Sequence, residues 1–217
     1  MKNLLKKELK LAASPLTWIF LAAVFFTFIP GYPILMGAFF VCLGIFYTFQ
    51  NGREANDILY GVLLPVAKKD IVAAKYAFVC LVQGIAFLLT AALTAVRMTA
   101  LAGAAVYQQN PLMNANPVFL AFVLLIFAAF NVFFLGGHFR NAYALGIPFL
   151  IFCIVALLLV SAAEALPHLP GLAFLHTPGG ERLGTQFVIL LAAAALYAAA
   201  TLLSCRASQR RFERTDL

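Results

Sequence analysis

Long apolar segments alternate with short polar segments along most of the chain. Six apolar segments can be recognised: Leu16–Ile29, Ile34–Phe49, Tyr76–Leu101, Val118–Leu135, Ala142–Ala165 and Thr185–Ser204. A helix needs about 20 apolar residues to cross a bilayer, so the first two segments are short. They are either tilted, extended by their flanks, or joined as a hairpin that does not fully cross. The pattern predicts an all-α integral membrane protein with six transmembrane helices in a single domain over residues 1–217.

The first residues have a different pattern, with apolar and basic positions on opposite sides of a helix. At 100° per residue, one side carries Leu5, Leu9 and Ala12, and the other carries Lys6, Lys7 and Lys10. Such a helix lies in the membrane interface, so we expect an amphipathic interfacial helix within residues 1–14. Pro15 then suits the first turn of the next helix, where its missing amide hydrogen is not needed.

The polar segment over residues 51–75 has internal order. A helix from Arg53 to Leu63 would place Arg53, Glu54, Asp57 and Tyr60 on one side, and Ala55, Ile58, Leu59 and Val62 on the other. The apolar side is expected to rest on the membrane helices, which leaves the charged side for water or a partner. Pro65 then ends this helix, because a proline disfavours helical geometry in the preceding residue and lacks an amide hydrogen. Asp70 is expected to cap the helix that re-enters the membrane, with Lys68, Lys69 and Lys75 near anionic headgroups.

Composition supports a membrane protein and excludes an ordinary soluble domain. Hydrophobic residues make up 64% of the chain, charged residues only 11%, and the mean hydropathy is +0.98. Charged residues usually make up about a quarter of a soluble domain. The net charge of +7 does not point to nucleic acid, because the basic residues lie at the ends of apolar segments. The four cysteines have no metal-ligand spacing and are expected to be free thiols: Cys42, Cys80, Cys153 and Cys205.

The positions of Lys and Arg predict the orientation. If the two termini share a side, every Lys and Arg except Arg97 and Arg182 lies on that side. The positive-inside rule then places both termini, the 51–75 loop and the 205–217 tail in the cytoplasm. Residues 102–117 and 166–184 become extracytoplasmic loops. In the second of these, the apolar segment Leu172–Leu175 either dips into the outer leaflet or forms one buried patch of an ordinary loop.

Three short motifs in the 51–75 loop carry a resemblance to a known family. They are E-x-x-D-x-x-Y at Glu54, Asp57 and Tyr60, L-P-V at Leu64–Val66, and K-D-I-V-x-x-K-Y at Lys69–Tyr76. Together with the amphipathic N-terminus, the six apolar segments and the basic tail, they resemble ABC-2 type transporter permeases. Ala67 departs from that family's pattern, which often has a polar or basic residue after L-P-V.

The resemblance implies that this loop carries a coupling helix that docks on a cytoplasmic ATP-binding subunit. The docking residues would be Arg53, Glu54, Asp57, Tyr60, Pro65, Lys69 and Asp70. A second permease chain is also implied, as a homodimer or a heterodimer. The sequence has no Gly-Lys pair and therefore no P-loop, so ATP and Mg would be bound by the partner subunit, with no cofactor in this chain. The alternative for the loop is a solvated connection with a re-entry cap.

Two isolated charges lie near the far ends of apolar segments. Arg97 and Glu164 are each about 30 Å from the cytoplasmic ends of their helices, at 1.5 Å per residue. An isolated charge in a span costs about 2.5–3.5 kcal/mol, and such residues are often functional. One hypothesis is an ion pair that gates the outer mouth or contacts substrate. The alternatives are that each side chain reaches the headgroups, or that the pair only locks two helices.

Other polar residues of the apolar segments have simpler expected roles. Gln83 and Asn131 are expected to form hydrogen bonds between helices. His138 and Arg140, in the turn after the fourth segment, either make a second, smaller contact with the ATP-binding subunit or act as a topological anchor. The apolar segments lack the Ser–His pairing or acidic cluster that an intramembrane enzyme would need.

These observations predict a transport subunit rather than an enzyme. It would be the permease of an ATP-driven ABC exporter in the cytoplasmic (inner) membrane of a bacterium. The many Phe residues and few charges of the spans favour a hydrophobic or amphipathic substrate, such as a peptide or an antibiotic. The alternative is a non-transporting scaffold or sensor subunit that recruits a cytoplasmic partner.

Overall fold

The computed structural model describes residues 2–140, 144–177 and 182–214, and within these ranges every regular element is a helix. The elements are α1 (Lys2–Lys7), η1 (Glu8–Ala12), α2 (Pro15–Ile19), η2 (Phe20–Phe28), α3 (Met36–Glu54), α4 (Asp57–Leu63), α5 (Lys68–Thr99), α6 (Ala105–Gln108), α7 (Pro117–Ala129), η3 (Phe130–Leu135), α8 (Gly136–His138), α9 (Gly146–Ala165), η4 (Leu166–His168), η5 (Ala173–Leu175) and α10 (Leu183–Glu213). The all-α prediction is therefore confirmed. Parts of three predicted segments lie outside the described residues: 142–143, 178–181 and 215–217.

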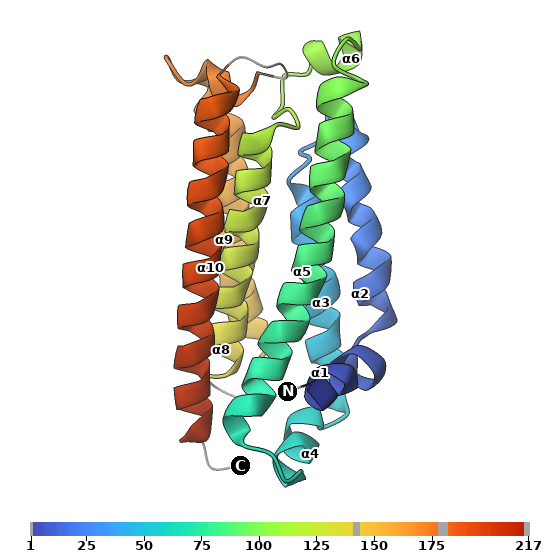
Figure 1. Ribbon diagram of the computed structural model, residues 1–217, viewed down its shortest axis with the longest axis vertical. Helices are drawn as coiled ribbons and strands as arrows, with labels where there is room; N and C mark the ends of the chain where they lie inside the picture. Colours follow the sequence, from blue (N-terminus) through green and yellow to red (C-terminus); the bar gives the residue numbers. More distant parts are fainter. Residues whose placement is uncertain (1, 141–143, 178–181, 215–217) are drawn as a thin grey trace.

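The long helices run side by side in one elongated bundle (Figure 1). α1 lies across the lower end of the bundle in this view, beside α4, and α6 lies at the upper end. These are called the α4 end and the α6 end below. α5 extends from the α4 end to the α6 end, and the last turn of α10 lies at the α4 end (Figure 1).

Four helices of the described chain are long and apolar enough to cross a membrane: Lys68–Thr99, Pro117–His138, Gly146–His168 and Leu183–Glu213. A fifth span results if Asn3–Ala12 and Pro15–Phe28, which meet at 90°, are counted together. The last four predicted apolar segments thus correspond to candidate spans, whereas the first two do not qualify separately. This is a multi-pass membrane protein. The described residues contain four or five candidate spans, whereas six were predicted from the sequence.

The sharp bend near the N-terminus has local causes. Ser14 is the N-cap of α2 and accepts a hydrogen bond from the amide of Leu16 at 3.3 Å, and Pro15 occupies the first turn as predicted. The amide of Ser14 donates to Thr48 Oγ1 of α3 at 2.9 Å, and Thr17 Oγ1 donates to the carbonyl of Gly44 at 2.7 Å. These bonds attach the bend to the middle of α3.

The segment α2–η2 and α3 form a tightly packed antiparallel hairpin. A Cβ atom at Gly44 would lie 2.7 Å from Cβ of Phe20, and one at Gly37 would lie 2.6 Å from the carbonyl oxygen of Ala23. Both distances are shorter than van der Waals contact, so only glycine permits this approach of the two backbones. The two short apolar segments of the sequence therefore pack closely on each other as neighbouring helices.

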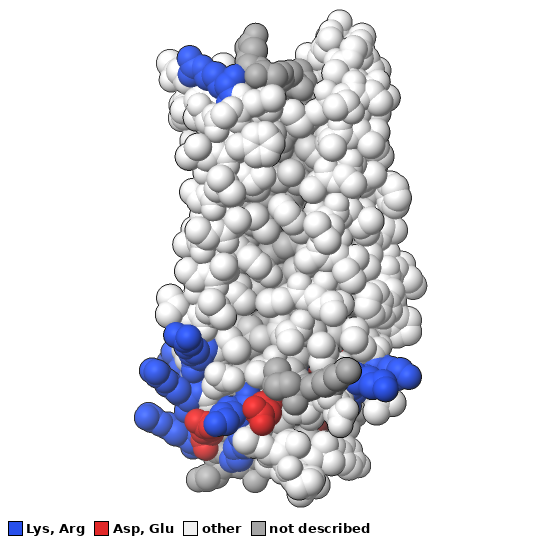
Figure 2. Space-filling model, viewed as in Figure 1, with Lys and Arg blue, Asp and Glu red and all other residues white. Residues whose placement is uncertain are grey.

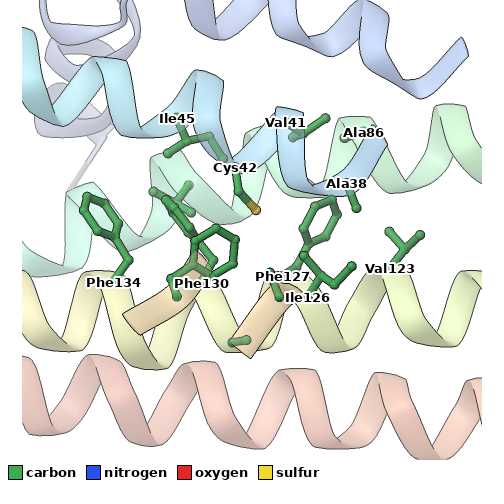
Figure 3. Close-up of a cluster of buried hydrophobic side chains, with 14 of the residues drawn as sticks. Ala38, Val41, Cys42, Ile45, Ala86, Val123, Ile126, Phe127, Phe130 and Phe134 are labelled. Atoms are coloured by element: carbon green, nitrogen blue, oxygen red, sulfur yellow. The ribbon is translucent and has the colours of Figure 1, made fainter. Parts of the chain in front are cut away.

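α7 is the central helix of the bundle, and its apolar side chains form the core. In the most apolar stretch of Pro117–His138, which begins with α7, 78% of the residues are buried. The corresponding share in α10 is 11%. Figure 3 shows side chains of α3, including Val41, Cys42 and Ile45, facing Phe127 and Phe130 of α7 and η3. The aromatic rings of η3 stack further, as in the 4.7 Å contact between Phe130 and Phe134. Cys42 and the other three cysteines are free, as expected.

Hydrogen bonds connect α5, η3 and α10 within the apolar interior. Gln83 and Asn131 exchange two side-chain hydrogen bonds of 3.0 Å, and Asn131 Nδ2 also donates to Thr201 Oγ1 at 2.9 Å. Tyr197 donates to Gln83 Oε1 at 2.9 Å. The prediction that Gln83 and Asn131 bridge helices is confirmed, because every bond joins two different elements.

Candidate functional site

The segment predicted as one helix from Arg53 to Leu63 is two helices. α3 ends at Glu54 and α4 begins at Asp57, because Asn56 between them has left-handed backbone angles, φ 53° and ψ 34°. Asparagine is one of the few residues that adopts this conformation readily. The prediction of a single continuous helix was therefore wrong. Arg53 and Glu54 lie on the last turn of α3, while Asp57 and Tyr60 lie on α4.

α4 buries a narrow apolar side against α5. Ile58 and Gly61 are buried, and a Cβ atom at Gly61 would lie only 3.4 Å from the side chain of Ile71. The opposite side is exposed and largely apolar, with Tyr60 66% and Leu63 74% exposed. Leu59 was predicted to rest on the membrane helices, but it is 41% exposed. α4 therefore presents apolar side chains rather than an acidic face.

Asp57 points into the protein, where it belongs to a closed ring of four charges. Its Oδ1 lies 2.5 Å from Lys7 Nζ and its Oδ2 lies 2.6 Å from Lys75 Nζ. Glu8 completes the ring, with Oε1 3.1 Å from Lys7 Nζ and Oε2 3.1 Å from Lys75 Nζ. We call Lys7, Glu8, Asp57 and Lys75 the four-charge ring. It joins α1, η1, α4 and α5.

The ring is largely removed from solvent. The side chains of Glu8 and Lys75 are 3% and 5% exposed, and those of Asp57 and Lys7 are 13% and 21% exposed. Burial works to raise the pKa of the Asp57 carboxyl, but Lys75 and Lys7 outweigh it and hold that pKa below its ordinary value. Asp57 is therefore ionised at neutral pH and fully engaged within the chain.

The ring was not predicted as a unit. Lys7 was assigned to the solvent side of the first helix, and Lys75 to the headgroup region. One signal was present in the sequence: Glu8 is the only acidic residue in a lysine-rich segment, and it adjoins apolar Leu9. Its partner Lys75 is 67 positions away, and local periodicity does not pair residues so distant.

The remaining predicted docking residues lie around the turn after α4. Leu64, before Pro65, has extended backbone angles, as the proline predicts. α5 begins at Lys68 after Ala67, so Asp70 does not cap it and lies within its first turn, where a negative charge is favoured. The carbonyl of Lys69 accepts a hydrogen bond from Gln209 Nε2 at 3.2 Å. Pro65 and Lys69 are exposed, whereas Asp70 is half-buried.

A groove of about 650 Å³ separates η1 from α4. Its rim carries Leu11, Tyr60 and Leu63, and Leu11 is 81% exposed. Lys7 and Asp57 both line the groove, and their ion pair connects α1 to α4. The α4 end thus combines an apolar rim with a buried, electrically neutral connection.

His138 does not face outward at this end. It is buried between aromatic rings, with centroids 5.2 Å from Phe49 and 6.2 Å from Phe134. Lys75 Nζ lies 5.5 Å from the centre of the Phe49 ring, so this aromatic cluster adjoins the four-charge ring. His138 therefore packs inside the bundle, which favours the anchoring alternative, while Arg140 is exposed.

Arg97 and Glu164, at the α6 end, do not form the predicted ion pair. Arg97 Nη1 donates to the carbonyl of Thr27 at 2.6 Å, and Nη2 donates to Asn114 Oδ1 at 3.1 Å. Glu164 Oε2 instead accepts from the amide of Met113 at 2.7 Å. The predicted pairing was wrong because equal depth does not fix the direction in which two side chains point. The two charges bind adjacent residues of the loop between α6 and α7.

The loop residues that receive these charges were not singled out from the sequence. The guanidinium of Arg97 stacks 4.1 Å from the centre of the Tyr107 ring, and the Tyr107 hydroxyl donates to the carbonyl of Phe28 at 3.0 Å.

In the other predicted loop, over residues 166–184, Leu175 is buried against the bundle. The apolar segment of that loop therefore packs on protein, as the second alternative for it stated.

Within the described ranges, there is no group of three or more His, Cys, Asp or Glu residues that could hold a metal ion.

A comparison with family models matches residues 3–209 to the ABC-2 family transporter protein model. No match to a curated protein or to a solved structure was found. The matched range contains the four-charge ring, every candidate span before α10, and most of α1 and α10. The chain therefore belongs to the ABC-2 family of transporter proteins.

Proposed function

We propose that this chain is the permease subunit of an ATP-driven ABC exporter and that the α4 end binds a separate ATP-binding subunit. The observation that carries the proposal is α4 itself, a short helix that leaves Tyr60 and Leu63 exposed next to the charged residues Arg53 and Glu54. Exposed aromatic and apolar side chains beside charges are typical of the centre and rim of a protein interface.

The α4 end is assigned to the cytoplasm in this proposal. On the face drawn in Figure 2, most Lys and Arg side chains lie around the α4 end. Such a distribution is typical of the cytoplasmic side of a membrane protein. Both termini would then be cytoplasmic, in the inner membrane of a bacterium.

The docking residues divide into two roles. Arg53, Glu54, Tyr60, Pro65 and Lys69 are exposed and would contact the ATP-binding subunit directly, with Asp70 supporting the start of α5. Asp57 would act indirectly, because its carboxylate is held by Lys7 and Lys75 and fixes the position of α4.

ATP and Mg would be bound by the partner, and its closure on ATP would move α4 and the helices attached to it. A second permease chain would complete the pathway. The exposed apolar side chains of α9 and α10, such as Ile147 and Leu191, suit contact with lipid or with that second chain. The apolar spans favour a hydrophobic or amphipathic substrate, including a peptide or an antibiotic.

Co-purification with co-expressed candidate ATP-binding subunits tests the docking site. Glu54→Lys with Tyr60→Asp should abolish the complex, because it reverses one exposed charge and places another in the apolar centre of the interface. The control is Gln109→Lys with Val106→Asp, which likewise introduces one lysine and one aspartate at exposed positions, but at the α6 end. The control should keep the complex, and a complex that survives Glu54→Lys with Tyr60→Asp contradicts the assignment.

Reconstitution of the purified complex in vesicles then tests transport. The permease should stimulate ATP hydrolysis by the bound subunit. Binding without any stimulation would instead support the non-transporting scaffold or sensor.

A further inference from the structure

We propose that the four-charge ring is a positioning unit that makes α1, α4 and α5 move together when the ATP-binding subunit moves α4. Lys7, Glu8 and Lys75 would thus be positioning residues for transport, although none of them lies on the exposed surface of α4. The inference rests on the proposed function for the source of the movement, but the ring's mechanical role can be tested without it.

The connectivity of the ring carries the first step. Each carboxylate uses its two oxygens on two different lysines, so Asp57 and Glu8 both bridge Lys7 and Lys75. No member can move away alone without breaking two ion pairs. The formal charges cancel, so the ring forms no attractive site for an additional ion.

Burial makes these ion pairs stronger as constraints than surface pairs would be. Exposed salt bridges contribute little because water and salt screen them. In a buried pair, loss of one partner leaves an uncompensated charge in a poorly solvated site. With Glu8 and Lys75 at most 5% exposed, separation of the ring is costly and movement as a unit is favoured.

The surroundings of α4 show what the ring constrains. α4 has irregular backbone on both sides, at the left-handed Asn56 and at the extended Leu64 before Pro65. Between these two points it is held by the close approach of Gly61 to Ile71 of α5 and by the ion pair of Asp57 with Lys75. Across the groove, the Lys7–Asp57 ion pair connects it to the N-terminal segment. A force on α4 therefore reaches α1 and α5 through the same four side chains.

Two pair-neutralised variants separate this role from simple packing. Lys7→Gln with Asp57→Asn keeps the Glu8–Lys75 pair, and Glu8→Gln with Lys75→Gln keeps the Lys7–Asp57 pair. Each removes one positive and one negative charge. Lys10→Gln with Glu213→Gln makes the same net change at exposed positions and serves as the control.

Amide hydrogen exchange of the full chain in lipid nanodiscs gives the first readout. In each variant, exchange should accelerate at least about fivefold in a ring element that carries no substitution, measured at the start of α5 for the first variant and in α4 for the second. The control should leave both elements at the wild-type rate. Acceleration confined to the substituted elements would overturn the proposal.

The second readout uses the complex with its ATP-binding subunit. In the wild type, ATP should change exchange in α4, η1 and the start of α5 together; in both ring variants the change should stay in α4. An ATP response in all three elements of the variants would refute the coupling role. If the wild-type chain binds no ATP-binding subunit, the proposed function fails, while the first readout still decides whether the ring acts as a unit.

Discussion

The two ends of the bundle hold buried charges in opposite ways. At the α4 end, two carboxylates and two lysines neutralise one another within 3.1 Å. At the α6 end, Arg97 and Glu164 are each bound by uncharged groups, including the carbonyl of Thr27 and the amide of Met113. In the four-charge ring, the stability of each charge depends on the presence of the other three. At the α6 end, the hydrogen bonds of Arg97 and Glu164 depend on the position of the loop between α6 and α7. The predictions below test this contrast, from the largest expected effect to the smallest.

Removal of Lys75 should have the largest effect. Lys75→Met leaves Glu8 and Asp57 with one lysine between them, and the loss of one partner from a buried ion pair typically costs about 3–5 kcal/mol. Thermal unfolding of the purified protein should show a large decrease in Tm. Lys69→Met, at an exposed position of the same helix, should change the stability by less than about 0.5 kcal/mol. Equal effects of the two substitutions would show that the ring does not contribute as described.

Replacement of Arg97 should cost less, because its partners are neutral. Arg97→Met leaves the Thr27 carbonyl and the Asn114 side chain without their donor, which should cost about 1–3 kcal/mol. Arg97→Lys should recover only part of this, since a lysine cannot bind two acceptors in a fixed fork while stacking on Tyr107. Full recovery by lysine, measured by the same unfolding experiment, would mean that only the positive charge matters.

The Asp57 carboxyl should make the α4 end sensitive to acid. Because its pKa is lowered in the folded protein, its contribution to stability is present above the ordinary value of 3.8 and is lost as pH falls through the lower folded value. The Tm difference between the wild type and Asp57→Asn should be largest above about pH 5 and shrink below pH 3.8. A difference that does not change with pH would contradict the lowered pKa.

Glu164→Gln should have the smallest effect. The amide oxygen of glutamine can still accept the hydrogen bond from the Met113 backbone, so stability should change by less than about 0.5 kcal/mol. An ion pair with Arg97 would predict a loss comparable to that of Arg97→Met. The exchanged variant Arg97→Glu with Glu164→Arg provides a second check, because it should remain as impaired as the Arg97→Glu single variant.

The sequence predicted features that depend on local pattern. Continuous apolar runs located the four long candidate spans, amphipathic periodicity located the lysine-rich N-terminal helix, and Pro15 located the first turn of the helix after it. Polarity within an apolar segment was enough to identify Gln83 and Asn131 as bridging residues, since a buried amide needs a partner. The docking motifs also drew attention to the region in which the structure places α4.

Features that depend on pairing across the fold were not predictable. The predicted helix continued through Asn56, because the local sequence does not distinguish an asparagine in a helix from one with left-handed backbone angles. Helical rise gave Arg97 and Glu164 the same depth, but the rotation of each helix, which decides their partners, comes from packing. The four-charge ring depends on both effects, because it requires the N-terminal segment to fold back onto α5.

The stripe of hydroxyl groups on α10 bears on how the last part of the chain is assembled. α10 is apolar enough to enter the bilayer alone, and only 11% of the residues in its most apolar stretch are buried by the rest of the protein. Tyr197, Thr201, Ser204 and Ser208 lie on one side of it and bond to Gln83, Asn131 and Tyr76. Insertion and docking of this helix can therefore be separate events during synthesis. Hydrogen-bond partners are scarce in the bilayer, so these hydroxyl groups, together with the packing of Ala193 against α7, favour the rotation at which the helix docks.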